Sequence, residues 1–578
     1  VQDLPAFLTQ LEKIMPGAQL VGAYAPAGIA VVRANFSLFE NQILPLPEVL
    51  YADRGAAEFR EELPVPGHNL FTNKISALQA VYPDWNGAGR TVSIKEFLFD
   101  TLDIDLWGRV APVLNGLGPV SPHAALMATL IAGAGNSGQA GRGVALGARV
   151  ATSFFGGLLP DSDAAYAAQD ISVQNHSYGL DIENYYSAGA MAYDYSVALR
   201  PVLLHVFSAG NAGDSSATVG SYAGIPGFAN LTGSFKMAKN ALLAGAVDSF
   251  GQALPFSSRG PAYDGRLKPD LMAFGQDGTS GAAALISGVA TVLQQAYAEQ
   301  HQGILPQSAL VRALLINGAD DVGAPGPDFV SGFGKLNALK SAEILGSGHF
   351  HEATVNHSDS VVLELNVPSG LRSLKITLAW DDPPAMAGAI TALVHDLGLQ
   401  LTGPDGQTIW LPLILNASPD ADSLRLPAIQ GVDTLNTVEQ IVVQNPAPGL
   451  YRIAVLGKKI EAGQQPFALA YYFEPADTFR WVSPVTMMPP HAGAPAVLFW
   501  EESFDEMFGA LSWRILGQAG WQVLEDQTPL KPGFYRWQTP DTFALAQLRM
   551  VIGGQTFLSD SFLLTQPMIP RVGFYCTD

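Results

Sequence analysis

Residues 278–288 read Gly-Thr-Ser-Gly-Ala-Ala-Ala-Leu-Ile-Ser-Gly, and small and apolar residues continue as far as Ala298. This run is too long for a strand and contains no proline, which predicts a buried helix that begins near Gly278. Ser280 would then lie in the first turn, where backbone N–H groups and the helix dipole favour negative charge. Such a position suits a nucleophile beside a developing oxyanion, although a serine at a helix start is more often an N-cap.

The bulk composition is that of a folded, turn-rich protein: 48% of the 578 residues are hydrophobic and 14% are charged. At about 150 residues per domain, the length predicts three or four domains.

The net charge of −21 disfavours a nucleic-acid partner, because phosphate backbones attract positive surfaces. The single cysteine, Cys576, excludes an internal disulfide. No apolar run approaches the roughly 20 residues that a membrane-spanning helix needs.

Residues 89–346 alternate strand patterns with helix patterns, which predicts an α/β fold with a doubly wound parallel sheet. Polar residues follow several apolar strands, at the sheet edge where proteins of this class place their sites. Glu96 and Asp100 follow the first strand, and Asn211 ends a later one. A helix of small residues begins at His123.

The motifs of this region resemble those of subtilisin-like serine proteases, the subtilase family. The family's histidine motif, which begins HGTHVAG, aligns on residues 123–133, and its asparagine motif, AAGN, aligns on residues 208–211. The serine motif, GTSMAAPHVAG, aligns without a gap on residues 278–288. Segments 253–270 and 332–337 resemble two further family segments, and the order acid, histidine, asparagine, serine is the family's order. The resemblance implies a subtilisin-like catalytic domain.

This resemblance also implies a function, that of a serine endopeptidase which hydrolyses peptide bonds through an acyl-enzyme. Ser280 would be the nucleophile and His123 the general base and acid, with a carboxylate orienting His123. The Asn211 side-chain amide and the Ser280 backbone N–H would form the oxyanion hole. The residues expected to bind substrate lie in two segments: Ser177, Tyr178, Gly179, Ser208 and Gly210.

Several residues depart from the family pattern. Glu96 aligns where the family has aspartate, which lengthens the carboxylate side chain by about 1.5 Å. Glutamate can orient a catalytic histidine, and Asp100 is the alternative acid. Gly281 and Ala284 replace the methionine and the proline that follow the family's serine. These changes support a second hypothesis, a catalytically impaired protein of the same fold that acts as a peptide-binding or adhesion module.

The flanking sequence predicts further domains around a catalytic domain at residues 67–346. Residues 1–66 combine a helical pattern with two short strands and a charged, proline-rich end, which indicates a small α+β module, either accessory or propeptide-like. Short alternating strands between turns predict two β-sandwich domains, the first a sandwich or jelly roll at 347–475 and the second immunoglobulin-like or fibronectin-like at 476–570. Residues 571–578 are expected to begin a further segment.

The first β-sandwich resembles the domain that follows the catalytic domain in some bacterial subtilases. Asp381, Asp382 and Asp396 are candidate ligands for a structural Ca²⁺ ion, with ordinary turn and edge aspartates as the alternative. The peptide-bond chemistry itself requires no cofactor. The tryptophans of the second β-sandwich are expected to fill its core, and a carbohydrate-binding stripe is the alternative reading.

The resemblance to exported bacterial subtilases implies a secreted or cell-surface protein. Its expected partners are polypeptide substrates, with association to a cell surface through the C-terminal region. Because Val1 is not a start methionine, we expect the chain to be a processed product.

Overall fold

The computed structural model describes residues 1–14, 19–34, 39–53, 69–116, 118–485 and 489–565. The chain divides into two compact units. The first contains Val1–Ile75 and Tyr82–Phe473, and the second contains Ser76–Val81 and Glu474–Asp578. The proline-rich end of the leading module and the segment 571–578 lie outside the described residues.

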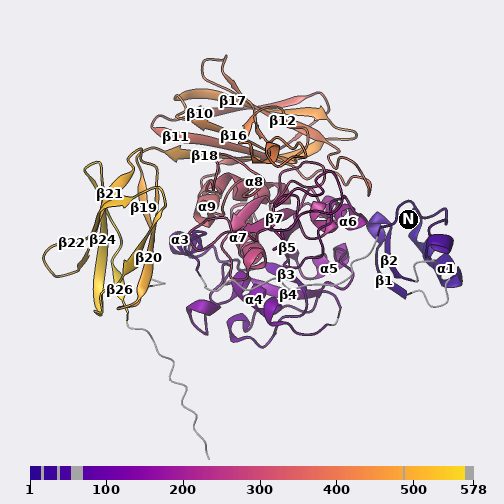
Figure 1. The fold of residues 1–578 in the computed structure, drawn as a ribbon, viewed down its shortest axis with the longest axis horizontal. Coiled ribbons are helices and arrows are strands. Elements are labelled where there is room, and N and C mark those ends of the chain that lie inside the picture. Colours follow the sequence, from indigo (N-terminus) through magenta and orange to yellow (C-terminus); the bar gives the residue numbers. More distant parts are fainter. Residues whose placement is uncertain (15–18, 35–38, 54–68, 117, 486–488, 566–578) are drawn as a thin grey trace, which may run out of the picture. The chain divides into compact units, whose positions relative to one another are not determined.

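The first unit is built around a parallel sheet of six strands in the order β4-β3-β5-β6-β7-β8. Figure 1 labels β3, β4, β5 and β7 of this sheet. Each adjacent pair is parallel, which confirms the predicted α/β sheet. The strands are almost wholly buried, as expected of a parallel sheet covered by helices on both faces. Their bounds are β3 Thr91–Glu96, β4 Arg149–Phe154, β5 Ile171–His176, β6 Leu204–Ser208, β7 Leu242–Ala246 and β8 Leu271–Ala273.

Helices cover both faces of this sheet. Asn175 and His176 are neighbours on β5 and therefore point to opposite faces. The Asn175 side chain accepts a hydrogen bond from Ser287 of α7 at 3.1 Å, whereas His176 packs against Tyr193 of α6 with ring centroids 5.3 Å apart. The sheet domain is thus doubly wound. Its helices are α4 Pro122–Ala132, α5 Asp163–Ala168, α6 Ala188–Leu199, α7 Gly278–Gln300, α8 Ser308–Gly318 and α9 Ala338–Gly346.

The central helix α7 begins at Gly278, as its sequence pattern predicts, and is buried as far as Ala298. Its small residues allow neighbouring segments to approach closely. A Cβ atom on Gly288 would lie 2.6 Å from the Cβ of Val144, so a larger residue there would force the two segments apart. This close packing fixes α7 against the segment that precedes β4.

A small module precedes the sheet domain. It contains α1 Leu4–Ile14, the antiparallel hairpin of β1 Gln19–Tyr24 and β2 Ile29–Arg33, and a small core that includes Leu4, Phe7, Leu11 and Ile43. Tyr24 and Ile29 of the hairpin also belong to a buried cluster with Leu159 and with Ala192 of α6. The Asp53 carboxylate accepts a hydrogen bond from the Ala188 N–H at 3.1 Å, at the start of the same helix. The module therefore packs on α6.

The rest of the first unit is a β-sandwich, which confirms the predicted fold class. Its two antiparallel sheets have the strand orders β10-β17-β12-β13 and β16-β11-β18-β9 and enclose a core that contains Trp380. The main strands are β9 Phe350–Val355, β10 Ser360–Val367, β11 Leu371–Ala379, β12 Asp396–Thr402, β13 Ile409–Trp410, β16 Val438–Gln444, β17 Gly449–Lys459 and β18 Gln465–Pro475. A small antiparallel pair joins β14 Leu413–Ile414 to β15 Ile429–Gln430.

The second unit contains two further antiparallel sheets, in the orders β19-β20-β23 and β22-β21-β24-β25, with β26 paired to β24. Trp500, Trp513 and Trp537 are buried in its core, as predicted. Trp521 instead contacts the guanidinium groups of Arg514 and Arg549, each 4.5 Å from the centre of its ring. The strands are β19 Phe479–Ser483, β20 Pro495–Glu502, β21 Phe508–Ile515, β22 Gln522–Pro529, β23 Phe534–Gln538, β24 Ala544–Ile552, β25 Gln555–Leu558 and β26 Phe562–Leu564. Residues Ser76–Val81 of the helix α3, Ile75–Val81, are also assigned to this unit.

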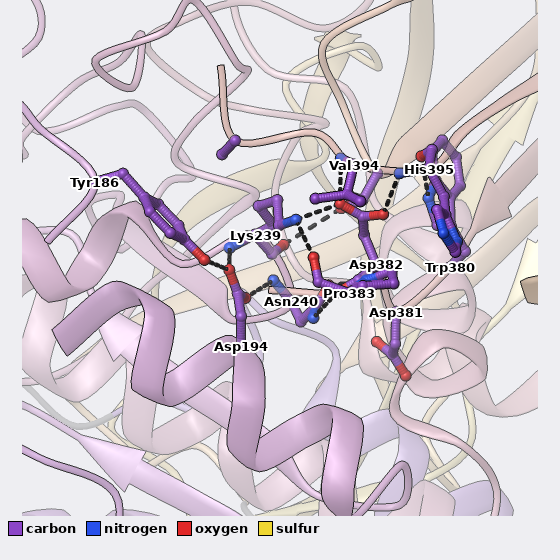
Figure 2. Close-up of polar contacts among 12 residues, drawn as sticks. Tyr186, Asp194, Lys239, Asn240, Trp380, Asp381, Asp382, Pro383, Val394 and His395 are labelled. Carbon is purple, nitrogen blue, oxygen red and sulfur yellow. Dashed lines mark hydrogen bonds and ion pairs between the residues drawn. The ribbon is translucent and has the colours of Figure 1, made fainter. Parts of the chain in front are cut away.

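The sheet domain and the first β-sandwich interlock at a buried polar junction (Figure 2). Asp382 is fully buried, and its carboxylate pairs with the ammonium group of Lys239. The same carboxylate accepts backbone N–H bonds from Val394 (2.9 Å) and His395 (2.7 Å). Asn240 exchanges hydrogen bonds of 2.8 and 2.9 Å with the Asp382 backbone. Burial raises the pKa of Asp382, and the Lys239 charge opposes that rise.

The segment that carries Lys239 is also held from the side of α6. Asp194 accepts backbone N–H bonds from Lys239 (3.1 Å) and Asn240 (2.9 Å), together with the Tyr186 hydroxyl proton at 2.6 Å (Figure 2). The same segment therefore contacts one carboxylate from α6 and another from the β-sandwich.

Apolar contacts extend this junction towards the carboxyl ends of the strands. Ala385 and Ala392, from the β-sandwich loop that follows Asp382, belong to the same buried cluster as Tyr178 and Phe207. The β-sandwich thus contributes to the core of the sheet domain beneath one of the segments expected to bind substrate.

The three aspartates considered as calcium ligands do not come together in one site. Each carboxylate has its own cationic partner: Asp381 pairs with Arg312 (3.0 Å), Asp382 with Lys239, and Asp396 with Lys458 (3.3 Å). Across the residues that the structure describes, no group of three or more His, Cys, Asp or Glu side chains is arranged to hold a metal ion. Among the described helices, none has the length and apolar character needed to cross a lipid bilayer.

Candidate active site

Glu96 and His123 form a buried pair at the carboxyl edge of the sheet. Glu96 is the last residue of β3, and its Oε2 lies 2.9 Å from the Nδ1 of His123. Only 4% of the Glu96 side chain and 5% of the His123 side chain are exposed. A carboxylate at Nδ1 holds the proton on that nitrogen and directs Nε2 away from it.

Local structure places His123 beside Glu96. Ser121 caps α4, because its hydroxyl oxygen accepts a hydrogen bond from the His123 N–H at 3.1 Å. The Ser121 N–H donates to the Leu98 carbonyl at 2.8 Å, two residues beyond Glu96. The start of α4 is therefore fixed directly against the end of β3.

Asp100, the alternative acid, lies in an exposed turn. Its carboxylate accepts a hydrogen bond from the backbone N–H of Leu102 at 2.9 Å. Of the two candidate acids, Glu96 is the one that the fold brings to His123.

Ser280 lies in the first turn of α7 and is completely buried. Its hydroxyl donates to the backbone carbonyl of Ser177 at 3.3 Å. In return, the Ser177 hydroxyl donates to the Ser280 carbonyl at 3.0 Å. This reciprocal pair ties the start of α7 to the segment that follows β5.

Asn211 approaches the same helix from the end of β6. Its carbonyl oxygen accepts hydrogen bonds from the Thr279 hydroxyl (2.9 Å) and the Thr279 N–H (3.3 Å). Its buried Nδ2 has no hydrogen-bond partner among the residues that the structure describes. Because buried amide donors are nearly always satisfied, an unused donor beside Ser280 suits an oxyanion-binding role.

Gly210 and Gly278 permit this approach. Gly210 has φ +118° and donates its N–H to the Thr279 hydroxyl at 3.3 Å. Gly278 has φ +65°, and a Cβ atom there would lie 3.0 Å from the Asn211 Nδ2. A glycine is therefore required at position 278 both for its backbone conformation and for the space it leaves.

The remaining residues expected to bind substrate meet at one edge of this site. The Tyr178 side chain is buried, and its hydroxyl contacts His176 Nδ1 (3.0 Å) and the Tyr193 hydroxyl (3.3 Å). Ser208 is also buried, and its hydroxyl donates to the Tyr178 carbonyl at 3.5 Å. Gly179 is buried as well. The side chain of Tyr178 thus supports the site from within the core.

Asp277 is a residue of the site that the sequence reasoning missed. Its Oδ2 lies 3.3 Å from the Nε2 of His123, and only 7% of its side chain is exposed. It occupies the N-cap position of α7 but makes no side-chain capping bond, and its backbone has φ +87°. An aspartate just before a helix normally indicates a cap, so no local signal pointed to this contact.

Charges on the opposite face of the sheet are separately compensated. Lys95 precedes Glu96 on β3 and pairs with Asp161 at 2.8 Å, with both side chains buried. Burial favours a higher pKa for Asp161, but Lys95 and hydrogen bonds from Gln174 and Ser153 outweigh it, so the pKa lies below its usual value. Burial also lowers the pKa of His205, to about 3.

Comparison with known proteins shows what the part of the chain that carries this site is similar to. Residues 117–334 match the family model described as the subtilase family, and this range includes His123, Asn211 and Ser280 but begins after Glu96. The serine protease/ABC transporter B family protein tagB of Dictyostelium discoideum is 26% identical over 318 residues, covering 39% of this chain and 16% of that protein. The subtilisin-like protease SBT6.1 of Arabidopsis thaliana is 30% identical over 125 residues, covering 18% of this chain and 12% of that protein. The chain thus aligns with less than a fifth of either relative.

Solved structures give similar matches. The patellamide maturation protease PatA is 20% identical, with a TM-score of 0.35, and the match covers 45% of this chain and 98% of that one. MycP1 from Mycobacterium smegmatis is 17% identical, with a TM-score of 0.36, and the match covers 50% of this chain and 89% of that one.

Proposed function

We propose that the chain is a serine endopeptidase that cleaves polypeptides through an acyl-enzyme, since residues 117–334 match the subtilase family model. The observation that carries this proposal is the buried Glu96–His123 pair beside the helix turn that holds Ser280. Those three groups, with the Asn211 amide, are the parts that acyl transfer needs: an oriented base, a hydroxyl nucleophile and an oxyanion donor.

The chemistry assigns one role to each residue. His123 Nε2 removes the Ser280 hydroxyl proton as the Ser280 Oγ forms a bond to the scissile carbonyl carbon. The carbonyl π electrons move to oxygen, and the Asn211 Nδ2 and the Ser280 N–H stabilise that oxyanion. His123 then gives its proton to the amine nitrogen as the C–N bond breaks. Water, deprotonated by the same histidine, releases the acid product from Ser280.

Glu96 acts through His123 and not on the substrate. Its carboxylate holds the Nδ1 proton and stabilises the imidazolium that forms when Nε2 accepts the proton. The longer side chain projects from the last residue of β3.

Polypeptide substrates would bind along segment 177–179 by backbone pairing, since the Tyr178 side chain is buried. We propose that the module predicted at residues 1–66 is propeptide-like, since its hairpin packs on α6 through Tyr24 and Ile29. We further propose that the protein is secreted or displayed at the cell surface, in keeping with the subtilase family.

The second candidate function is a catalytically impaired, peptide-binding protein of the same fold. Two contacts favour it: Asp277 lies at His123 Nε2, and the Ser280 hydroxyl is directed to Ser177. Both contacts must change before catalysis can begin.

Covalent labelling separates the two functions. A fluorophosphonate reagent applied to the folded protein is expected to modify Ser280, with the adduct mapped by peptide mass spectrometry. Ser280→Ala should abolish labelling, and Glu96→Gln should slow it strongly. Labelling that is absent from the folded wild type between pH 5 and pH 9, or that persists in Ser280→Ala, would reject the protease proposal.

A further inference from the structure

His123 lies between two carboxylates, and the second of them occupies the nitrogen that catalysis needs. Glu96 contacts Nδ1 at 2.9 Å, and Asp277 contacts Nε2 at 3.3 Å. Between 4% and 7% of each of these three side chains is exposed. The contact with Asp277 is therefore made inside the protein, where electrostatic interactions are strong.

The local backbone shows that Asp277 is turned towards His123 and not towards its own helix. Aspartate at an N-cap normally accepts a hydrogen bond from the second or third helical N–H. Asp277 makes no such bond and adopts φ +87° and ψ +36°, a left-handed conformation that costs energy for a residue other than glycine. The Thr279 N–H is satisfied by Asn211, which arrives from the end of β6.

The contact of Asp277 with Nε2 is a charge contact at 3.3 Å and lacks hydrogen-bond geometry. An ionised carboxylate at this distance favours the imidazolium form of His123, and Glu96 does the same at Nδ1. In the imidazolium, Nε2 has no lone pair available for the Ser280 proton, and the Ser280 hydroxyl is directed instead to the Ser177 carbonyl.

We propose that Asp277 holds the enzyme in a resting state by occupying His123 Nε2, and that a bound polypeptide displaces it. This inference rests on the proposed protease function. Asp277 is thus a positioning residue that competes with the nucleophile for the catalytic nitrogen, and two carboxylates together favour the inactive imidazolium.

The other charged groups on the elements around His123 are engaged elsewhere. On β3, Lys95 points to the opposite face of the sheet. The loop between β3 and α4 carries carboxylates whose contacts lie away from the ring. Those contacts are Asp103 with the Thr129 hydroxyl, Asp105 with Ser137, and Asp100 with the Leu102 N–H.

The test is the pH dependence of Asp277→Asn, which keeps the shape of the side chain and removes its charge. The acid limb of the kcat/KM profile is expected to move to lower pH by at least one unit, so that the variant is about tenfold more active than wild type on that limb. Asp214→Asn, which removes an exposed carboxylate in the loop after Asn211, should follow the wild-type profile. An Asp277→Asn profile that coincides with wild type, or that is lower at every pH, would overturn the proposal.

A second measurement does not depend on activity. In protein carrying Ser280→Ala and ¹⁵N-labelled histidine, the Nε2 resonance of His123, assigned by its loss in His123→Gln, reports protonation directly. We expect Nε2 to remain protonated to higher pH with Asp277 than with asparagine. Identical titrations would overturn the resting-state proposal even if wild type is an active protease. A clear difference would support it even if Ser280 proves unreactive, which separates this inference from the proposed function.

Discussion

The Oε2 of Glu96 lies 2.9 Å from the Nδ1 of His123, at the point where β3 ends and α4 begins. A glutamate therefore reaches the position where the subtilase pattern has an aspartate. Glu96 lies at the end of the strand and His123 in the first turn of the helix, so their contact depends on how these two elements meet.

Glu96→Gln is expected to lower kcat by about 10²–10⁴-fold, because an amide cannot stabilise the imidazolium and can hold the wrong tautomer. Glu96→Asp should lower kcat less, since it keeps the charge but withdraws the carboxylate by about 1.5 Å. Steady-state hydrolysis of a peptide substrate measures both. Leu102→Ala alters an exposed side chain in the same loop and serves as the control. A kcat unchanged in Glu96→Gln would remove Glu96 from the site.

Gly278→Ala is expected to lower kcat about 10²-fold, as large as the loss of one oxyanion donor, because the new methyl group would crowd the Asn211 amide at 3.0 Å. Gly303→Ala is the matched control. It also has a positive φ, of +86°, but a Cβ there meets no atom within 4 Å. Gly303→Ala should therefore cost stability of about 1 kcal/mol without changing kcat. Equal activities of the two variants would contradict the proposed position of the oxyanion donor.

Asp382→Ala is expected to destabilise the first unit by about 3–5 kcal/mol, because it leaves the Lys239 charge buried without its carboxylate. Urea unfolding monitored by intrinsic fluorescence measures the change. Glu364→Gln removes one partner of an exposed pair, with Arg452, in which 61% of each side chain is accessible. That control should change stability by less than about 1 kcal/mol. A cost for Asp382→Ala as small as the control's would show that the junction contributes little.

His205 is expected to make the fold sensitive to acid. Burial, reinforced by the positive charge of Lys95, lowers the pKa of His205 from 6.5 to about 3 in the folded chain. Below pH 6.5 the unfolded chain binds a proton that the folded chain does not, so stability falls as the pH drops towards 3, by up to about 1.4 kcal/mol per unit. In His205→Gln the free energy of unfolding should depend less steeply on pH, because one fewer proton is taken up on unfolding. Parallel curves for the two proteins, measured by urea unfolding at several pH values, would contradict the assignment.

Local pattern was sufficient to predict the parallel sheet and the start of α7. Both depend on apolar periodicity and on small residues, and these are properties of neighbouring positions in the sequence. The motif spacing likewise placed Glu96, His123, Asn211 and Ser280 at strand ends and helix starts, where the fold puts them.

The orientation of Asp277 could not be predicted in this way. An aspartate before Gly-Thr-Ser indicates an N-cap, but Asn211, from a distant strand, accepts the Thr279 N–H instead. The orientation of the Asp277 side chain is set by the positive φ of its backbone and by the approach of α4, and both are tertiary effects.

The aspartates of the β-sandwich show the same limit. Asp381 and Asp382 are consecutive acids at a strand end, which in sequence suggests a cation site. Their partners, Arg312 and Lys239, come from a different domain. Pairing between distant segments leaves no local pattern, so the ion pairs became visible only in the folded chain.

The junction around Asp382 constrains how a protein of this kind can evolve. A recombination event that attached a different C-terminal domain would remove the carboxylate that neutralises Lys239, and with it Ala385 and Ala392, which pack in the cluster that contains Tyr178. Swapping either domain alone would thus damage both the fold and the segment beside Ser280. The coding regions of the two domains are therefore expected to be inherited together, with paired changes at positions 239 and 382.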